Sequence, residues 1–444
     1  MSRKRAIIKG TFILTLTGFA TRFMGFFYRI FLSHTFGEEG VGIYQLVFPI
    51  YALCFSLTCA GIETALSRCV AARAARGKDK EAKELLYTSL AFTVTASALT
   101  TLILQRYALS ISEYFLKEQR CKDLLIILSY AFPFAAVHSC ICGYYFGLKQ
   151  TKIPALSQFI EQTARILSVY LLYLYGTRHG IHFNVAIAVL GLIAGEAASS
   201  IFCLNALTKG RILPAMSRFH FRRCLRHGRE LLSLSVPLTA SRVLLNLLQS
   251  IEAVSIPIQL QSHKMELSQA LSTYGVLTGM ALPCILFPSA ITNSVSTMLL
   301  PTVAEIQALD DRRELSELIR KITSCCIFLG SICCVTLLCF GQWMGNVLFH
   351  SSMAGDFIIT LAWMCPFLYT NSTLISIING IGRTKLSFCI NSASLGIRIA
   401  SVFMLIPVFG IEGYLWGLLA SQISIFVFCL LYLGCYLRKE IRKN

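Results

Sequence analysis

The chain has 444 residues, of which 55% are hydrophobic and only 14% are charged, and its formal net charge is +18. Soluble domains carry about 25% charged residues, so this composition excludes an ordinary soluble globule. Apolar runs of about 20 residues recur from end to end, which is the length of a helix that crosses a bilayer. The sequence therefore predicts an all-α, polytopic membrane protein.

About twelve transmembrane helices are predicted, in two six-helix lobes. The N-terminal lobe covers 1–208, a basic cytoplasmic linker covers 209–229, and the C-terminal lobe covers 230–444. Most lysines and arginines outside the spans fall on one side of the membrane, so the positive-inside rule places both chain ends in the cytoplasm. The predicted spans are 8–31, 41–66, 85–105, 123–148, 155–175, 183–207, 230–257, 272–300, 321–348, 356–381, 386–407 and 411–437.

The first predicted span is apolar but contains two arginines, Arg22 near its middle and Arg29 further along. A charge at the centre of a membrane helix costs at least about 2.5–3.5 kcal/mol, so such a residue usually faces other helices or a water-filled cavity. Polar or small residues recur every three or four positions and so share one helix face. These residues are Thr15, Gly18, Arg22, Gly25 and Arg29. We interpret this face as one wall of a cationic cavity.

Three later spans repeat the pattern of an arginine on a polar helix face. The fifth span carries Arg165 and the eleventh carries Arg398, while the seventh carries Arg242 followed by Asn246 and Gln249. All of these residues, with Arg22 and Arg29, are candidate ligands for a substrate in a central cavity. A guanidinium suits an anionic substrate because its planar fork stays charged and binds phosphate oxygens two at a time.

Intramembrane acids leave the role of each arginine open. Arg165 can pair with Glu161, which lies four residues earlier on the same helix. Arg22, Arg29 and Arg242 have no acid at helical spacing within their own spans, so they are the stronger candidates for binding an anion. The alternative for every intramembrane arginine is a structural ion pair or a position near the interface. The acids Glu63, Glu161 and Glu196 are candidates either for a coupling ion, Na⁺ or H⁺, or for ion pairing.

The sequence does not indicate catalysis, metal binding or nucleic-acid binding. The sequence contains no P-loop, HExxH or GxSxG motif, so we predict no catalytic residues and no enzyme activity. The eighteen cysteines fall mostly inside apolar spans without paired CxxC spacing, which predicts reduced, buried residues and no metal site. Because membrane topology accounts for most of the positive charge, nucleic acid is not an expected partner. The basic linker is expected to contact anionic membrane lipids.

The sequence also repeats itself. One constant spacing relates Pro133 to Pro366, Gly147 to Gly380 and Arg165 to Arg398. A second match relates the segment around Arg22 to the segment around Arg242. Because each repeat holds an even number of spans, the two lobes are expected to be parallel, an arrangement typical of alternating-access transporters.

Three stretches carry a resemblance to a known family. The opening GTFILTLTGFATRFMGFFYRIFLSHTFGEEGVGIYQLVFPIYAL resembles the start of the stage V sporulation protein B group of polysaccharide-lipid exporters. The later stretches GMALPCILFPSAITNSVSTMLLPTVAE and NGIGRTKLSFCINSASLGIRI resemble further signatures of that group. The group is part of the multidrug/oligosaccharidyl-lipid/polysaccharide exporter superfamily, with the lipid II flippase and the MATE-type exporters. The resemblance implies two MATE-like six-helix lobes around a V-shaped cavity.

The resemblance also bears on single residues. In lipid II flippases, arginines of the first helix line the cavity and are essential, and Arg22 matches the first of them through the pattern arginine-x-x-glycine-phenylalanine. Arg29 stands one residue away from the second, as in the sporulation group. Members often carry two further carboxy-terminal helices, whereas about twelve helices are predicted here.

The function expected from the residues and the resemblance together is transport. The leading hypothesis is a monomeric, multi-pass flippase of the bacterial cytoplasmic membrane. By alternating access it would translocate an undecaprenyl-pyrophosphate-linked oligosaccharide or a lipid II-like peptidoglycan precursor. The alternative is an ion-coupled multidrug exporter of the same fold. A membrane-embedded glycosyltransferase or a scaffold is disfavoured, because the predicted outer loops are short and contain few carboxylates. No cofactor is expected beyond a coupling ion.

Overall fold

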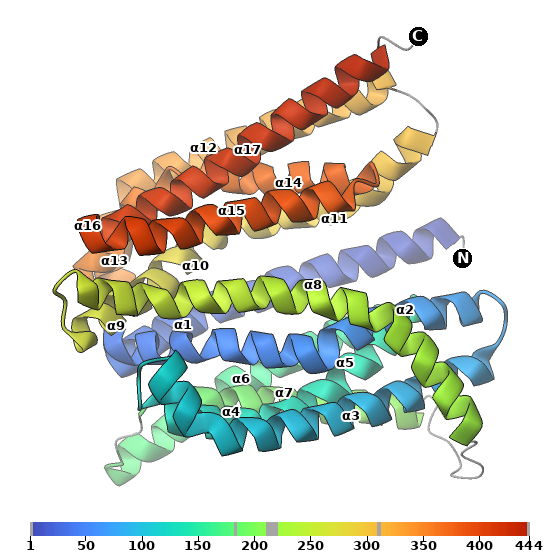
Figure 1. Ribbon diagram of the computed structural model, residues 1–444, viewed down its shortest axis with the longest axis horizontal. Helices are drawn as coiled ribbons and strands as arrows, with labels where there is room; N and C mark the ends of the chain where they lie inside the picture. The colour runs from blue at the N-terminus through green and yellow to red at the C-terminus, as the bar shows by residue number, and fades with distance from the viewer. Residues whose placement is uncertain (1–2, 182–183, 210–220, 309–311, 442–444) are drawn as a thin grey trace. The chain divides into compact units, whose positions relative to one another are not determined.

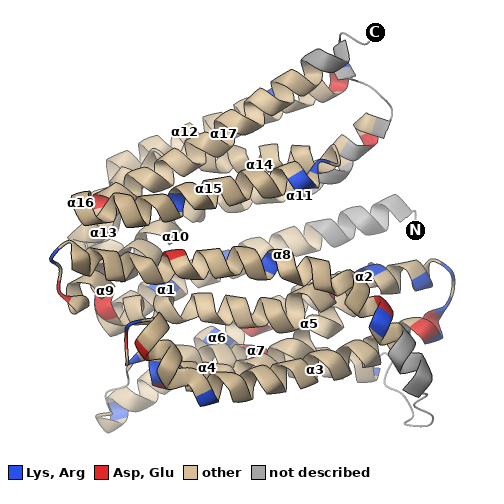
Figure 2. Ribbon diagram, in the orientation of Figure 1, with Lys and Arg blue, Asp and Glu red and all other residues tan. Residues whose placement is uncertain are grey.

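The computed structural model describes residues 3–181, 184–209, 221–308 and 312–441. Every regular element within these ranges is a helix (Figure 1), which confirms the all-α prediction. The physical reason is that backbone N–H and C=O groups inside a bilayer find no water and must pair within their own segment. Figure 2 shows that charged residues concentrate at helix ends and in the connections between helices, while helix interiors are mainly neutral.

The chain folds into two compact units. The first unit comprises Met1–Tyr28 and Ile43–Ser250, and the second comprises Arg29–Gly42 and Ile251–Asn444. The unit boundaries therefore fall inside two long helices, α1 (Arg3–Phe55) and α8 (Phe221–Ser262). The division predicted from the sequence instead begins the second lobe at 230. Much of the predicted linker 209–229 lies outside the described residues, and the two predicted lobes stay a prediction.

The first unit is built mainly from helices joined by short connections. Buried side chains of α2, α3, α5 and α7, with Leu231 of α8, form its apolar core. Besides its parts of α1 and α8, the unit contains η1 (Ser56–Ala60), α2 (Gly61–Ala74), α3 (Asp79–Ser110), η2 (Ile111–Phe115), α4 (Cys121–Ser129), α5 (Ala131–Gly147), α6 (Lys152–His179) and α7 (Ala186–Lys209).

The second unit has its own core, formed by buried side chains of α11, α12, α14, α15 and α17. Its helices are α9 (Leu267–Gly275), η3 (Val276–Ala281), α10 (Leu282–Leu286), α11 (Ser289–Ala308), α12 (Arg312–Leu348), α13 (Ser352–Ala362), α14 (Cys365–Gly380), α15 (Thr384–Met404), α16 (Ile406–Phe409) and α17 (Ile411–Ile441). The segments η1, η2 and η3 are π-helical turns.

The described residues contain eight to ten candidate membrane spans, depending on how two bent helix pairs are counted. Eight helices of the described residues are long and apolar enough to cross a membrane, or up to ten if the bent pairs α4–α5 (43°) and α13–α14 (56°) each form one span. A single run, Phe12–Ala74, covers two predicted spans. It is interrupted at Gly37, whose φ of 67° and ψ of −178° are accessible almost only to glycine. Helix α6 is not among the eight, and it carries Glu161 and Arg165. The predicted polytopic membrane protein is confirmed, while the count of twelve and the cytoplasmic termini stay predictions.

Close helix packing positions the intramembrane acids of the first unit. A Cβ atom on Gly143 of α5 would lie 2.8 Å from the Glu63 carbonyl oxygen of α2. A Cβ atom on Gly195 of α7 would lie 2.7 Å from the Glu161 carbonyl oxygen of α6. Only glycine permits these approaches, which bring α5 against the Glu63 helix α2 and bring the helices of Glu161 and Glu196, α6 and α7, close together.

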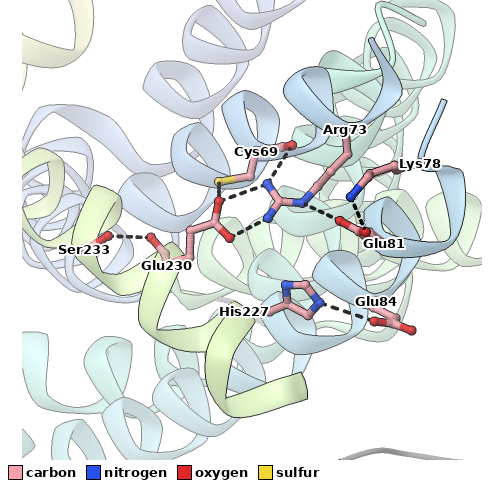
Figure 3. A network of polar contacts seen from close by, with 8 residues as sticks. All are labelled: Cys69, Arg73, Lys78, Glu81, Glu84, His227, Glu230 and Ser233. Carbon is pink, nitrogen blue, oxygen red and sulfur yellow. Dashed lines mark hydrogen bonds and ion pairs between the residues drawn. The ribbon is translucent and has the colours of Figure 1, made fainter. Parts of the chain in front are cut away.

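A polar network ties together the ends of α2, α3 and α8 (Figure 3). Arg73 of α2 donates to both carboxylate oxygens of Glu230 on α8, at 3.0 and 2.5 Å, and its Nε lies 3.8 Å from a Glu81 oxygen on α3. Lys78 contacts Glu81 at 2.8 Å, and His227 lies 3.3 Å from Glu84. The bidentate Arg73–Glu230 pair is the strongest part, because both N–H groups of the fork meet charged acceptors.

We expect the Glu230→Gln substitution to lower the thermal unfolding temperature of the detergent-solubilised protein. The Arg73 side chain is only 15% exposed, so losing its charged acceptor removes hydrogen bonds that contribute about 1.5–3 kcal/mol. Lys78→Gln is the matched control, since the Lys78–Glu81 pair is exposed and such pairs contribute about 0.2–1 kcal/mol. Equal shifts for the two variants would show that the Arg73–Glu230 pair does not hold α2 to α8.

Candidate functional site

Arg242, on α8, binds the π-helical turn at the start of α2. Its Nη1 donates to the Ala60 carbonyl oxygen at 3.0 Å and its Nη2 to Thr64 Oγ1 at 3.2 Å. Ala60 is the last residue of η1. A π-turn shifts the helical hydrogen-bonding register, and such turns occur frequently at functional sites. The guanidinium is exposed and is held by two neutral acceptors.

The next turns of α8 continue this polar seam. Asn246 Nδ2 donates to the Ala52 carbonyl oxygen at 3.3 Å and also contacts Ser56 Oγ. Ser250 Oγ donates to the Pro49 carbonyl oxygen at 3.2 Å. These positions follow Arg242 at intervals of four, so they lie on one face of α8. Gln249 is exposed.

Arg29 makes a comparable contact inside the second unit. Its Nη1 donates to the Thr278 carbonyl oxygen at 3.1 Å. Thr278 lies in the π-helical η3, so two of the predicted cavity arginines, Arg29 and Arg242, each bind a backbone carbonyl of a π-turn within their own unit. Sequence spacing could not reveal this, because π-turns have no clear sequence signature.

Arg22 differs from the other arginines of the spans. It is exposed on α1, and within the described residues it has no hydrogen bond or ion pair. One turn further on, Gly25 lies against Gln162 of α6, with 3.4 Å between an added Cβ and Gln162 Nε2. Arg22 thus lies one turn from Gly25, at the point where α1 packs against the polar side chain of Gln162 on α6.

Arg165 and Arg398 are both paired with carboxylates. Arg165 forms an ion pair with Glu161 on the same helix, and its Nη1 also lies 3.4 Å from Gln162 Oε1. Arg398 on α15 donates through Nε to Glu252 at 2.7 Å, and Tyr414 donates to the same oxygen at 2.7 Å. Helical spacing made the first pair foreseeable. The second joins residues far apart in the sequence and was not foreseen.

The remaining acids of the first unit lie in buried polar contacts. Glu63 accepts a hydrogen bond from Ser139 Oγ at 3.1 Å and is close enough to Arg242 for charge attraction. Glu196 is buried and accepts from Tyr51 at 2.8 Å, and its second oxygen lies 3.3 Å from His138 Nδ1. Neither Tyr51 nor His138 was singled out from the sequence.

The arginines therefore make three kinds of contact. Arg165 and Arg398 form ion pairs, Arg29 and Arg242 donate to backbone carbonyl oxygens, and Arg22 has no hydrogen bond or ion pair among the described residues. Potential cation ligands also converge: one ligand atom each from His138, Glu161 and Glu196 lies within 4.8 Å of the others. Substrate binding by the arginines and ion coupling by the acids stay predictions.

The structure thus defines a helical, multi-pass membrane protein with charged groups inside its spans, and comparisons with known proteins place the chain more closely. The family described as Polysaccharide biosynthesis protein matches residues 7–307, so the chain belongs to that family.

Individual proteins support this placement. Stage V sporulation protein B of Bacillus subtilis (strain 168) is 28% identical over 428 residues, covering 95% of this chain and 82% of the relative. Lipid II flippase MurJ of the same organism is 21% identical over 421 residues, covering 89% of this chain and 76% of the relative. The inward-facing structure of a multidrug resistance MATE family transporter of the MOP superfamily superposes with a TM-score of 0.71 at 14% identity, covering 98% of this chain and 99% of the other. The predicted family resemblance is confirmed.

We expect Glu252→Gln to destabilise the protein strongly. The Glu252 side chain is only 3% exposed, and removing one partner of a buried ion pair costs about 3–5 kcal/mol, because the remaining charge is left uncompensated. Thermal unfolding in detergent should show a clear drop for this variant, and a smaller drop for Glu252→Gln combined with Arg398→Gln. Glu412→Gln, at an exposed position of α17, is the control. If the single variant unfolds like the control, the pair contributes nothing to stability.

Proposed function

We propose that this chain is a flippase that translocates a polyprenyl-pyrophosphate-linked glycan, such as a lipid II-like precursor, across the bacterial cytoplasmic membrane. Family membership, the lipid II flippase among the relatives and the MATE-type fold support a transporter or flippase rather than an enzyme. The choice of an anionic lipid as cargo rests on the arginines.

The observation that carries this proposal is the state of Arg22 and Arg242, both in the first unit. Arg22 has no partner among the described residues, and Arg242 donates to a carbonyl and a hydroxyl oxygen, attracting Glu63 without forming an ion pair with it. An un-neutralised cation within a membrane span is costly, which makes a functional role the default explanation. The two guanidinium groups are proposed to bind the diphosphate, each through a bidentate fork. Arg29, Arg165 and Arg398 stay predicted ligands.

The rest of the cargo follows from its chemistry. The polyprenyl tail stays in the hydrocarbon phase, because moving it into water would cost about 0.8 kcal/mol per CH₂. The polar headgroup must cross through a protein-lined path. Alternating access requires that bound cargo stabilise one conformation more than the other, and a diphosphate that attracts cationic side chains provides such a difference.

The second candidate is an ion-coupled multidrug exporter, favoured by the MATE-type fold. Binding an organic cation needs available carboxylates. Glu161 and Glu252 are paired with arginines, and Glu196 accepts a hydrogen bond from Tyr51 and lies beside His138. Glu63 is the remaining acid of these spans; it accepts a hydrogen bond from Ser139 and attracts Arg242. Most of the carboxylates therefore already have partners, and this candidate ranks second. A coupling Na⁺ or H⁺ stays a prediction.

The test is a flipping assay in proteoliposomes with a fluorescent polyprenyl-diphosphate-linked sugar, in which a membrane-impermeant reductant bleaches the outer leaflet. Arg22→Ala and Arg242→Ala should each lower the flipping rate about tenfold or more, since a charge-assisted hydrogen bond contributes about 1.5–3 kcal/mol and 1.4 kcal/mol is a factor of ten. Lysine at either position should restore part of the rate, because it keeps the charge but not the fork.

Arg106→Ala is the matched control, because Arg106 is an exposed arginine near the end of α3, on the predicted outer side of the membrane. Its flipping rate should equal that of the unmodified protein. Wild-type rates for both Arg22→Ala and Arg242→Ala would overturn diphosphate binding by these residues. Export of fluorescent organic cations without flipping of the lipid would support the second candidate instead.

A further inference from the structure

We propose that His138, Cys142 and Cys203, in the first unit, form a binding site for a thiophilic d¹⁰ metal ion, with Zn²⁺ the best match. This inference does not depend on the proposed cargo. It assigns a role to a buried cluster that the arginine-based mechanism does not use.

The three side chains converge from two helices. His138 and Cys142 are four residues apart on α5, so they share one helix face, and Cys203 comes from α7. One ligand atom from each residue lies within 4.8 Å of the other two. In a tetrahedral Zn²⁺ site the metal lies about 2.3 Å from sulfur and about 2.0–2.1 Å from nitrogen. Metal binding therefore requires the three side chains to draw together from the separations of up to 4.8 Å seen here.

The hydrogen bonds of His138 orient its ring for this role. Its Nδ1 lies 3.3 Å from a Glu196 oxygen, and the other Glu196 oxygen accepts from Tyr51 at 2.8 Å. Its Nε2 lies 3.1 Å from Ser157 Oγ, which in turn lies 3.4 Å from Cys142 Sγ. Nε2 is therefore the nitrogen on the thiol side. A carboxylate on the far nitrogen of a metal-binding histidine is a common arrangement that fixes the ring and its tautomer.

Burial and charge favour a divalent ion. Cys203 is fully buried and Cys142 is 6% exposed. Binding of Zn²⁺ displaces the two thiol protons, and the resulting unit of two thiolates, a neutral imidazole and Zn²⁺ carries no net charge. A neutral assembly avoids the desolvation cost of an isolated charge in a low-dielectric interior. The Ser157 hydroxyl, already adjacent to two of the ligands, is placed to serve as the fourth.

The neighbouring cysteine provides an internal control. Cys140 is also buried, on the same helix, but its sulfur lies 3.0 Å from Thr93 Oγ1 of α3. It does not belong to the converging set. If the cysteines of these spans were only small apolar side chains, Cys140 and Cys142 would behave alike towards metals.

The experiment uses the full-length protein in detergent under reducing conditions, after chelation and removal of the chelator. With ZnSO₄ we expect one Zn²⁺ per chain by elemental analysis and a higher thermal unfolding temperature. Co²⁺ as a spectroscopic substitute should produce thiolate-to-metal charge-transfer absorption. Cys142→Ser and Cys203→Ser should each lower affinity for Zn²⁺ at least tenfold and remove most of that absorption, whereas Cys140→Ser should change neither.

X-ray absorption of the Zn²⁺-loaded wild-type protein is the second measurement, and it stays informative if the cysteine variants fail to fold. Two sulfur and two nitrogen or oxygen ligands are expected. A shell without sulfur, or equal Zn²⁺ affinity in Cys140→Ser and Cys142→Ser, would overturn the site. The site would also be overturned if the protein bound no Zn²⁺ and only formed a Cys142–Cys203 disulfide on oxidation.

Discussion

Inside a bilayer a guanidinium group has to find its hydrogen-bond acceptors within the protein, and much of this structure follows from that constraint. Two solutions occur among the described residues, and Arg22, which has no hydrogen bond or ion pair there, is the exception. Arg165 and Arg398 are paired with carboxylates, whereas Arg29 and Arg242 donate to carbonyl oxygens of π-helical turns. A hydrogen bond to a carbonyl oxygen satisfies the donor without cancelling its charge. Arg242, held in this way, keeps its positive potential available to an anion.

The internal repeat shows how sequence and structure diverge. Arg165 and Arg398 occupy equivalent positions in the two repeats, and both are ion-paired, but the acid comes from a different place in each case. Glu161 lies on the same helix as Arg165, while the equivalent position near Arg398 is Ser394. Glu252, on α8, supplies the missing carboxylate. Both repeats thus pair their arginine with a carboxylate, although the carboxylate comes from a different position in each repeat.

This difference explains what could be predicted from the sequence. Helical periodicity and hydropathy are local signals, so the membrane helices, the arginines within the spans and the Arg165–Glu161 pair were foreseeable. The Arg398–Glu252 pair and the His138–Glu196–Tyr51 contacts join helices that are distant in the sequence, and no spacing rule reports them. The same holds for His138, Cys142 and Cys203: a metal motif is recognisable from sequence only when its ligands are close along the chain. The π-turns and the break at Gly37 depend on backbone geometry, which composition does not encode.

The MATE-type fold does not by itself decide the cargo, because one architecture hosts transporters of different substrates. What distinguishes them physically is the sign of the charges that remain after internal pairing. In the first unit, Glu161 is matched by Arg165 and Glu196 by a hydrogen bond from a tyrosine and contact with a histidine, whereas Arg22 has no partner among the described residues. Arg242 attracts Glu63 but forms no ion pair with it. The positive excess therefore lies in groups with fork geometry, and the proposed diphosphate cargo, with two negative phosphoryl groups, would match both the sign and the shape of that excess.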